Sequence, residues 1–168
     1  YNKDLPDYTA LQKYEPPVMT RVHAADGSLL AEYAKERRLY IPIQAVPKLV
    51  KEAFISAEDK NFYEHGGIDP TGIARAIWSN IENYGKRRPQ GASTITQQVA
   101  KNFLVGDEKS INRKIKEALL AIRIERAYPK DKILELYLNE IYLGLGAYGI
   151  AAASLIYFDK SVHELTTE

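Results

Sequence analysis

Apolar residues recur every three or four positions through most of the chain after Pro42, and this spacing predicts helices. Prolines, glycines and polar turns divide the pattern into six helical segments. They cover about 47–63, 70–84, a segment that opens at 94, 110–126, 130–143 and 148–158. The chain is therefore predicted to be mainly α-helical.

The first 34 residues follow a different pattern. Three prolines among mixed polar residues predict an extended segment over residues 1–17. Between Met19 and Ala34, two strand-like runs flank Asp26-Gly27, a pair that favours the tight turn of a β-hairpin. We therefore expect a small N-terminal β-hairpin and a helical domain over 18–168.

Composition restricts the class of protein. A chain of 168 residues with 45 % hydrophobic and 27 % charged residues predicts one folded domain. The net charge of +1 gives no general reason to expect nucleic-acid binding, so any anion site has to come from local clustering. No apolar run reaches about 18 residues, no signal peptide opens the chain, and a further helix starts at its end. We read the sequence as an excised piece, truncated at its C-terminal end.

One carboxylate interrupts an apolar stripe. Val50, Phe54, Glu58 and Phe62 are spaced by four, so they share one face of the first predicted helix. Partial burial of Glu58 would raise its pKa and suit it to accept a proton near neutral pH. The alternative is a Glu at the edge of the stripe that reaches solvent or pairs with a base.

Polar residues gather on the third and fourth predicted helices, which are both amphipathic. Thr94 and Gln97 match a capping box, and the free amides of a helix N-terminus favour an anion. A capped helix with a solvated polar face would explain the same pattern. On the following helix, Arg113 and Glu117 are four apart and could form an ordinary surface pair. Together, however, the cations of both helices predict a clamp for a diphosphate leaving group; they are Lys101, Arg113 and Lys114.

Four segments, in order, resemble the motifs of the peptidoglycan glycosyltransferases, glycosyltransferase family fifty-one. The first runs from Glu58 to Gly67 and reads EDKNFYEHGG, and the second runs from Gly91 to Asn102 and reads GASTITQQVAKN. The third is RKIKE at 113–117 and the fourth is KILELYLN at 132–139. The likeness covers about residues 20–160.

The resemblance implies a lysozyme-like, two-lobed helical fold and a substrate, lipid II, carried on a polyprenyl pyrophosphate. It implies that Glu58 deprotonates the acceptor sugar's 4-hydroxyl and that Glu117 is a second essential carboxylate, which positions the clamp or an associated divalent ion. Lys101, Arg113 and Lys114 would hold the pyrophosphate, with any Mg²⁺ bound through that group. The remaining substrate-binding candidates line the cleft; they are Asp59, Ser93, Thr94, Gln97, Gln98 and Asn102.

The likeness weakens in the fifth motif, where Leu145, Ala151 and Asp159 depart from the family pattern. We therefore assign no catalytic role to residues of this segment. The whole resembles the transferase half of a class A penicillin-binding protein, although a monofunctional transferase would fit the same motifs. That pattern implies the outer face of the bacterial cytoplasmic membrane, an anchor before the domain and a penicillin-sensitive transpeptidase after it. The basic loop Lys86-Arg87-Arg88, near Trp78 and Tyr84, could touch lipid headgroups or be solvated. A glycan-cleaving enzyme and a non-catalytic wall-binding module are the rival functions.

Overall fold

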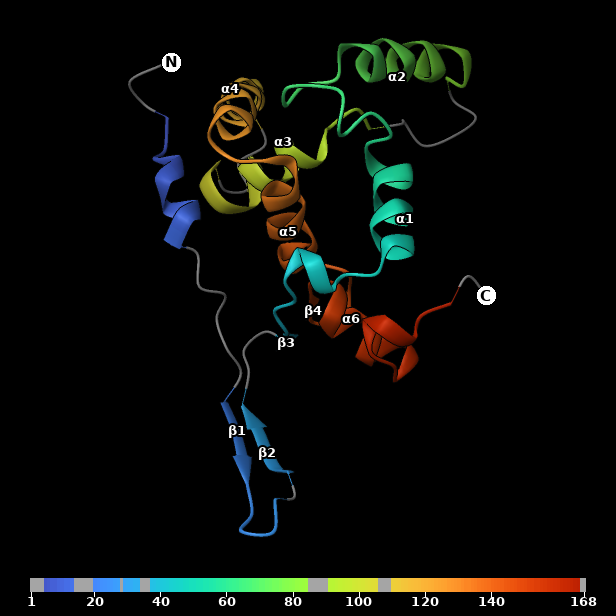
Figure 1. Cartoon of the computed structure of the whole chain (residues 1–168). Helices are drawn as coiled ribbons and strands as arrows, with labels where there is room; N and C mark the ends of the chain where they lie inside the picture. Colours follow the sequence, from blue (N-terminus) through green and yellow to red (C-terminus); the bar gives the residue numbers. More distant parts are fainter. Residues whose placement is uncertain are drawn as a thin grey trace.

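The computed structural model describes residues 5–13, 20–27, 29–33, 37–84, 91–105 and 110–166. Within these ranges the chain is mainly helical, as predicted, with six α-helices and four short strands (Figure 1). The helices are α1 (Lys48–Glu58), α2 (Pro70–Glu82), α3 (Ile95–Ala100), α4 (Ile111–Ala127), α5 (Lys130–Glu140) and α6 (Ile150–Phe158). The strands are β1 (Thr20–His23), β2 (Leu29–Tyr33), β3 (Arg37–Arg38) and β4 (Ala147–Tyr148).

The core forms where α3, α4 and α5 meet (Figure 1). Ile95 and Val99 of α3 pack with Leu120 and Ile124 of α4, all nearly inaccessible to solvent. Every residue of α5 from Ile133 to Asn139 is buried. A helix that is buried on all sides has no room for a solvated polar face, so the polar side chains of α5 need internal partners.

The N-terminal residues contain more structure than the prolines indicated. Residues 1–17 were predicted to be extended, but Tyr8–Lys13 form a 3₁₀ helix. Leu11 of this helix is buried in the core, and the Tyr128 hydroxyl donates to the Tyr8 carbonyl oxygen at 3.0 Å. Hydrophobic burial therefore attaches this segment to the main body.

Two antiparallel strands extend away from the helices. β1 pairs with β2 on either side of Asp26-Gly27, and Figure 1 shows this pair well apart from the helical body. β3 pairs in parallel with β4, which brings Arg38 to the C-terminal end of α5, where it forms an ion pair with Glu140.

Helix α2 begins at Pro70, as predicted, with Asp69 as its N-cap. The Asp69 carboxylate accepts hydrogen bonds from the Thr71 amide at 3.0 Å, the Thr71 hydroxyl at 2.6 Å and the Asn61 side-chain amide at 3.0 Å. These bonds favour the charged form. The Thr71 hydroxyl contributes most, and the pKa of Asp69 falls to about 2.

Replacing Asp69 by Ala should lower the free energy of unfolding by about 1 kcal/mol at pH 7, because α2 loses its N-cap. A lowered pKa stabilises the fold only while the carboxylate is charged. The difference between wild type and variant should therefore shrink as the pH falls below about 4 and disappear only below about 2. Urea unfolding across this pH range measures it, and a difference that stays constant down to pH 2 would contradict the role of the charge.

Candidate active site

The loop after α1 is fixed to the start of α3 by Asp59. Its buried carboxylate accepts a hydrogen bond from the Ile95 amide at 3.0 Å, the first free amide of α3. The same carboxylate lies 2.9 Å from His65 Nε2. His65 Nδ1 accepts from the Gly67 amide at 3.1 Å, so Nε2 carries the proton and donates to Asp59. Asp59, predicted to bind substrate, therefore holds the backbone of the site together.

Gly67 allows this loop to approach the helices closely. Its φ is +100°, and a Cβ at this position would lie 2.7 Å from the Ala121 carbonyl oxygen of α4. The Gly67 carbonyl oxygen accepts a 2.7 Å hydrogen bond from the Thr94 hydroxyl. Gly67 thus allows the loop to contact both α4 and the residue that caps α3.

Glu58 is the last residue of α1, and its side chain is exposed. Helix α1 was predicted to continue to Tyr63, which would have kept Glu58 on a partly buried stripe. Of the two interpretations of Glu58, the structure shows the one at the edge of the stripe, where the side chain reaches solvent. The Gln98 side-chain amide donates to Glu58 Oε2 at 2.9 Å. Glu58 Oε1 accepts no hydrogen bond from the described part of the chain, so it can accept a proton from a bound ligand.

The second carboxylate, Glu117, is almost fully buried on α4 and bound by two cations. Arg113 Nη1 lies 3.0 Å from Glu117 Oε1, and Lys114 Nζ lies 2.8 Å from Glu117 Oε2. The alternative of an ordinary surface pair is therefore wrong. The Lys114 ammonium also donates to the Ser93 hydroxyl at 3.0 Å, which connects α4 to the residues just before α3.

Two residues that were predicted to bind substrate cap the N-terminus of α3. Thr94 and Gln97 form the predicted capping box: the Thr94 hydroxyl accepts from the Gln97 amide, and Gln97 Oε1 accepts from the Thr94 amide. Both residues are buried. This geometry gives them a structural role that fixes Ser93 and Gln98 on either side.

Lys101 and Asn102 lie farther along the same helical segment. Residues Lys101–Val105 form a π-helical turn, which rotates the following side chains relative to the α-helical spacing assumed from the sequence. Lys101 is half-buried and Asn102 is exposed. Within the described residues, no hydrogen bond or ion pair joins either of them to Glu58 or to Glu117.

A polar pocket of about 120 Å³ lies between Glu58 and the loop that precedes α3. Ser93 belongs to its wall, so the pocket connects Glu58 to the Lys114 end of the clamp. Lys60 and Arg75 also line it and add positive charge. Neither cation was predicted from the sequence to belong to the site. Lys60 stands within the first motif, whereas Arg75 lies on α2, outside all four motifs.

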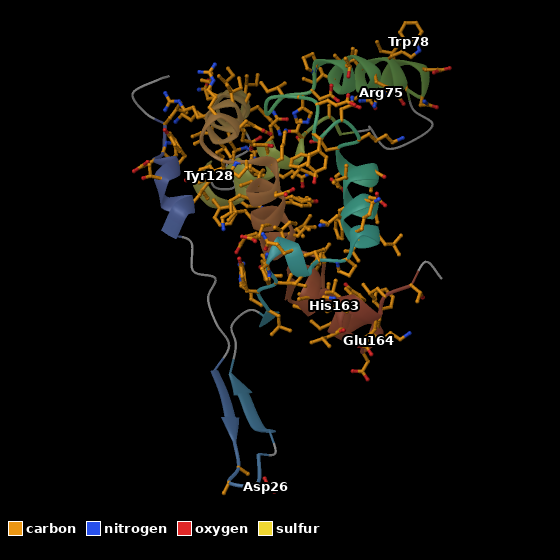
Figure 2. All side chains as sticks on the ribbon, in the orientation of Figure 1. Asp26, Arg75, Trp78, Tyr128, His163 and Glu164 are labelled. Atoms are coloured by element: carbon orange, nitrogen blue, oxygen red, sulfur yellow. The ribbon has the colours of Figure 1, made fainter. Side chains whose placement is uncertain are left out.

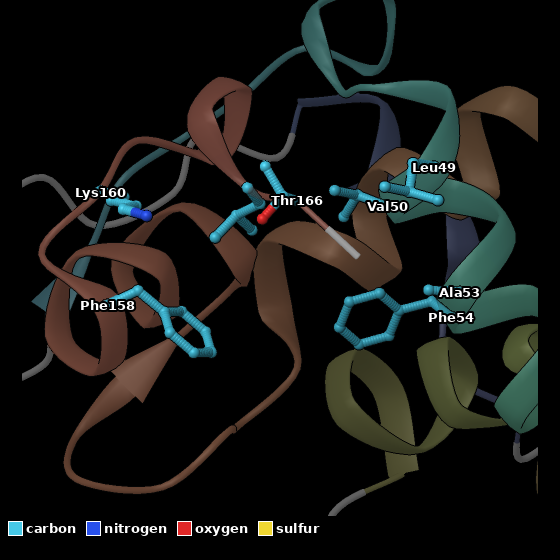
Figure 3. Close-up of a pocket in the computed structure, with 8 residues that line it drawn as sticks. Leu49, Val50, Ala53, Phe54, Phe158, Lys160 and Thr166 are labelled. Carbon is cyan, nitrogen blue, oxygen red and sulfur yellow. The ribbon is translucent and has the colours of Figure 1, made fainter. Parts of the chain in front are cut away.

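A larger, mostly apolar pocket of about 500 Å³ separates α1 from α6. Figure 3 shows Phe54 and Phe158 facing each other across it, with Lys160 and Thr166 at its edge. Phe54 stands one helical turn before Glu58, so this pocket lies on the same side of α1 as the candidate base.

The described residues contain no group of three or more His, Asp or Glu side chains that could hold a metal ion. Lys86, Arg87 and Arg88 of the basic loop lie outside the described residues. In the fifth motif, Leu145 and Asp159 both have positive φ, at 49° and 51°. Asp tolerates this left-handed conformation better than most residues, so Asp159 can end α6 where the family pattern has glycine.

Comparison with known proteins identifies the family. The sequence model of the family described as Transglycosylase matches residues 26–168. The chain is 58 % identical over 167 residues to penicillin-binding protein 1A of Rickettsia conorii, covering 99 % of this chain and 21 % of that protein. It is 51 % identical over 162 residues to penicillin-binding protein 1A of Neisseria cinerea, covering 96 % and 20 %. The chain thus spans about a fifth of the length of these relatives. It belongs to the transglycosylase family, as the order of its four motifs indicated.

Proposed function

We propose that the chain is the peptidoglycan glycosyltransferase domain of a larger, class A penicillin-binding protein, and that it polymerises lipid II into β-1,4-linked glycan strands. The observation that carries this proposal is the connection between the two carboxylates. Exposed Glu58 lines a polar pocket whose wall includes Ser93, and Ser93 accepts a hydrogen bond from the clamp residue Lys114. A base and a cationic clamp are the two groups that transfer from a pyrophosphate donor requires.

In the proposed reaction, Glu58 Oε1 accepts the proton of the acceptor's 4-hydroxyl while Gln98 holds Oε2. The deprotonated oxygen attacks the anomeric carbon of the growing chain from the face opposite the leaving group, which inverts the configuration. The bond to the polyprenyl pyrophosphate breaks, and that group leaves with the electron pair. Lys114 and Arg113 stabilise its growing negative charge.

The role of Glu117 in this proposal is to position the clamp. A buried carboxylate between two cations fixes their side chains before substrate binds, so less reorganisation is needed during the reaction. Because Glu117 is already bound by Arg113 and Lys114, any Mg²⁺ would be held through the substrate's pyrophosphate. The lysozyme-like, two-lobed layout is also part of the proposal.

Incubation with lipid II, and separately with finished glycan strands, tests the function. We expect polymer from lipid II and no cleavage of finished strands. Cleavage without polymerisation would identify a glycan-cleaving enzyme and overturn the proposal. Parallel reactions with EDTA would measure the dependence on a divalent cation.

We also propose that α2 contacts the outer face of the cytoplasmic membrane, where lipid II is embedded. No helix among the described residues is long and apolar enough to cross a membrane. Instead, α2 carries an exposed apolar surface, and Figure 2 shows Trp78 pointing away from the rest of the protein. The exposed residues are Ile77, Trp78 and Ile81 of α2 and Tyr84 just after it. A cluster of exposed apolar side chains favours a membrane or protein contact.

Replacing Ile81 by Gln should weaken binding to phosphatidylglycerol vesicles roughly fivefold, because one apolar side chain no longer enters the lipid. Vesicle sedimentation measures the effect. The control is Leu155→Gln on α6, another exposed aliphatic residue, which lies on a helix far from α2 (Figure 1). Equal losses in the two variants would contradict a membrane contact through α2.

A further inference from the structure

The hydroxyl of Tyr137 is buried without a hydrogen-bond partner. Tyr137 lies on α5, only 1 % of the residue is exposed, and its Oη finds no partner in the described part of the chain. Buried hydroxyl groups nearly always form a hydrogen bond, because otherwise the loss of water is uncompensated. Phenylalanine would fill the same space without that cost, so packing explains the ring of Tyr137 but not its hydroxyl.

The other unpaired atoms indicate where such groups occur. Among the described side chains, the buried polar atoms without a hydrogen bond are Arg113 Nε, Glu117 Oε1 and Tyr137 Oη, although Glu117 Oε1 forms an ion pair with Arg113 Nη1. The first two belong to the clamp. The third belongs to a ring that packs edge-on against Phe54, one helical turn before Glu58 on α1. The clamp and the helix that ends at Glu58 therefore account for the surroundings of all three atoms.

The surroundings of Tyr137 keep its hydroxyl protonated. Burial, together with the nearby Glu58 carboxylate, raises the pKa of Tyr137 far above its ordinary value. A phenol in this state can donate a hydrogen bond at any physiological pH. Phe54 contacts the Tyr137 ring edge-on, with the ring centroids 6.3 Å apart, and stands one turn before Glu58 on α1. This contact holds the ring beside the helix that ends at Glu58.

We propose that Tyr137 is a positioning residue whose hydroxyl donates a hydrogen bond to Glu58 Oε1 during the reaction. Gln98 already occupies Oε2, so the two donors would hold the carboxylate from both oxygens. A carboxylate oxygen has two lone pairs, and Oε1 can therefore accept this bond and still receive the acceptor's proton. The inference rests on the proposed function, in which Glu58 is the general base.

The test is Tyr137→Phe, assayed by steady-state polymerisation of lipid II between pH 5 and 9. We expect kcat to fall roughly tenfold with little change in KM, because a hydrogen bond to a charged group is lost. The acidic limb of the kcat profile should move to higher pH, since the charged form of the base loses a donor. The charged groups that line the pocket with Glu58 stay unchanged in the variant; they are Asp59, Lys60, Asp69 and Arg75.

A matched control separates this role from stability. Tyr128 is also buried, but its hydroxyl donates to the Tyr8 carbonyl oxygen. Tyr128→Phe should therefore lower Tm and leave kcat unchanged, whereas Tyr137→Phe should keep or raise Tm while kcat falls. Incorporating 3-fluorotyrosine at position 137 restores a hydroxyl and should restore most of the activity.

Each outcome decides the inference. If wild type polymerises lipid II and Tyr137→Phe matches it in kcat and pH profile, the positioning role is wrong while the proposed function stands. A Tyr137→Phe protein that loses both activity and stability, without rescue by 3-fluorotyrosine, shows a structural role and overturns the inference. A wild-type protein without polymerising activity would overturn both proposals.

Discussion

Replacing Glu58 by Gln should lower the rate of lipid II polymerisation by about 10²- to 10⁴-fold, the range expected for loss of a general base. The amide has nearly the same shape as the carboxylate but cannot accept the acceptor's proton. Its carbonyl oxygen can still receive the hydrogen bond from Gln98. Because Glu58 is exposed, Tm should change little.

Three measurements on the Glu58→Gln protein separate the candidate functions. Polymerisation of lipid II reports the base, thermal unfolding reports the fold, and binding of a short-chain lipid II analogue reports the clamp. We expect only the first to change. A non-catalytic wall-binding module would keep its function in the variant, so retention of more than about a tenth of wild-type activity would contradict the role of Glu58.

The sequence predicted the starts of α2 and α3 well because both have strong boundary signals. Pro70 begins α2 with Asp69 as its cap, and the Thr94–Gln97 capping box opens α3 as expected. The end of α1 had no equally clear signal. The apolar stripe continues to Phe62, and this residue is indeed buried, but it reaches the core from the loop. A four-residue spacing cannot distinguish a longer helix from a loop that returns an aromatic ring to the same core.

The roles of the site residues were harder to predict than which residues belong to the site. Asp59, Thr94 and Gln97 occur in the same motifs as Glu58 and Gln98. These three side chains, however, are buried and form hydrogen bonds with the protein's own backbone. Sequence patterns show which residues gather, whereas the direction of each side chain depends on tertiary contacts. Tyr137 illustrates the limit: on an apolar helix it looks like a core aromatic, and only the unpaired hydroxyl distinguishes it.

Replacing Lys114 by Met should weaken binding of the pyrophosphate donor by about 10- to 150-fold, the effect of one lost hydrogen bond between charged groups. The Lys114 ammonium is half-exposed, so it can reach a ligand while Glu117 and Ser93 hold it at 2.8 and 3.0 Å. Methionine keeps most of the side-chain volume and removes the charge. Glu117 retains Arg113 as a partner, so the fold should be preserved.

The Glu58→Gln protein is a suitable background for this measurement because the donor should bind without reacting. Adding Lys114→Met to it should lower affinity for a short-chain lipid II analogue, and calorimetry measures the change. Adding Lys48→Met instead removes a cation from an exposed pair with Glu52, whose atoms lie 3.5 Å apart, and should have no effect. Equal losses of donor affinity from Lys114→Met and Lys48→Met would show that the clamp attracts the donor only through nonspecific charge. If donor affinity depends on Lys114 but not on Glu58, then different residues bind the leaving group and accept the proton.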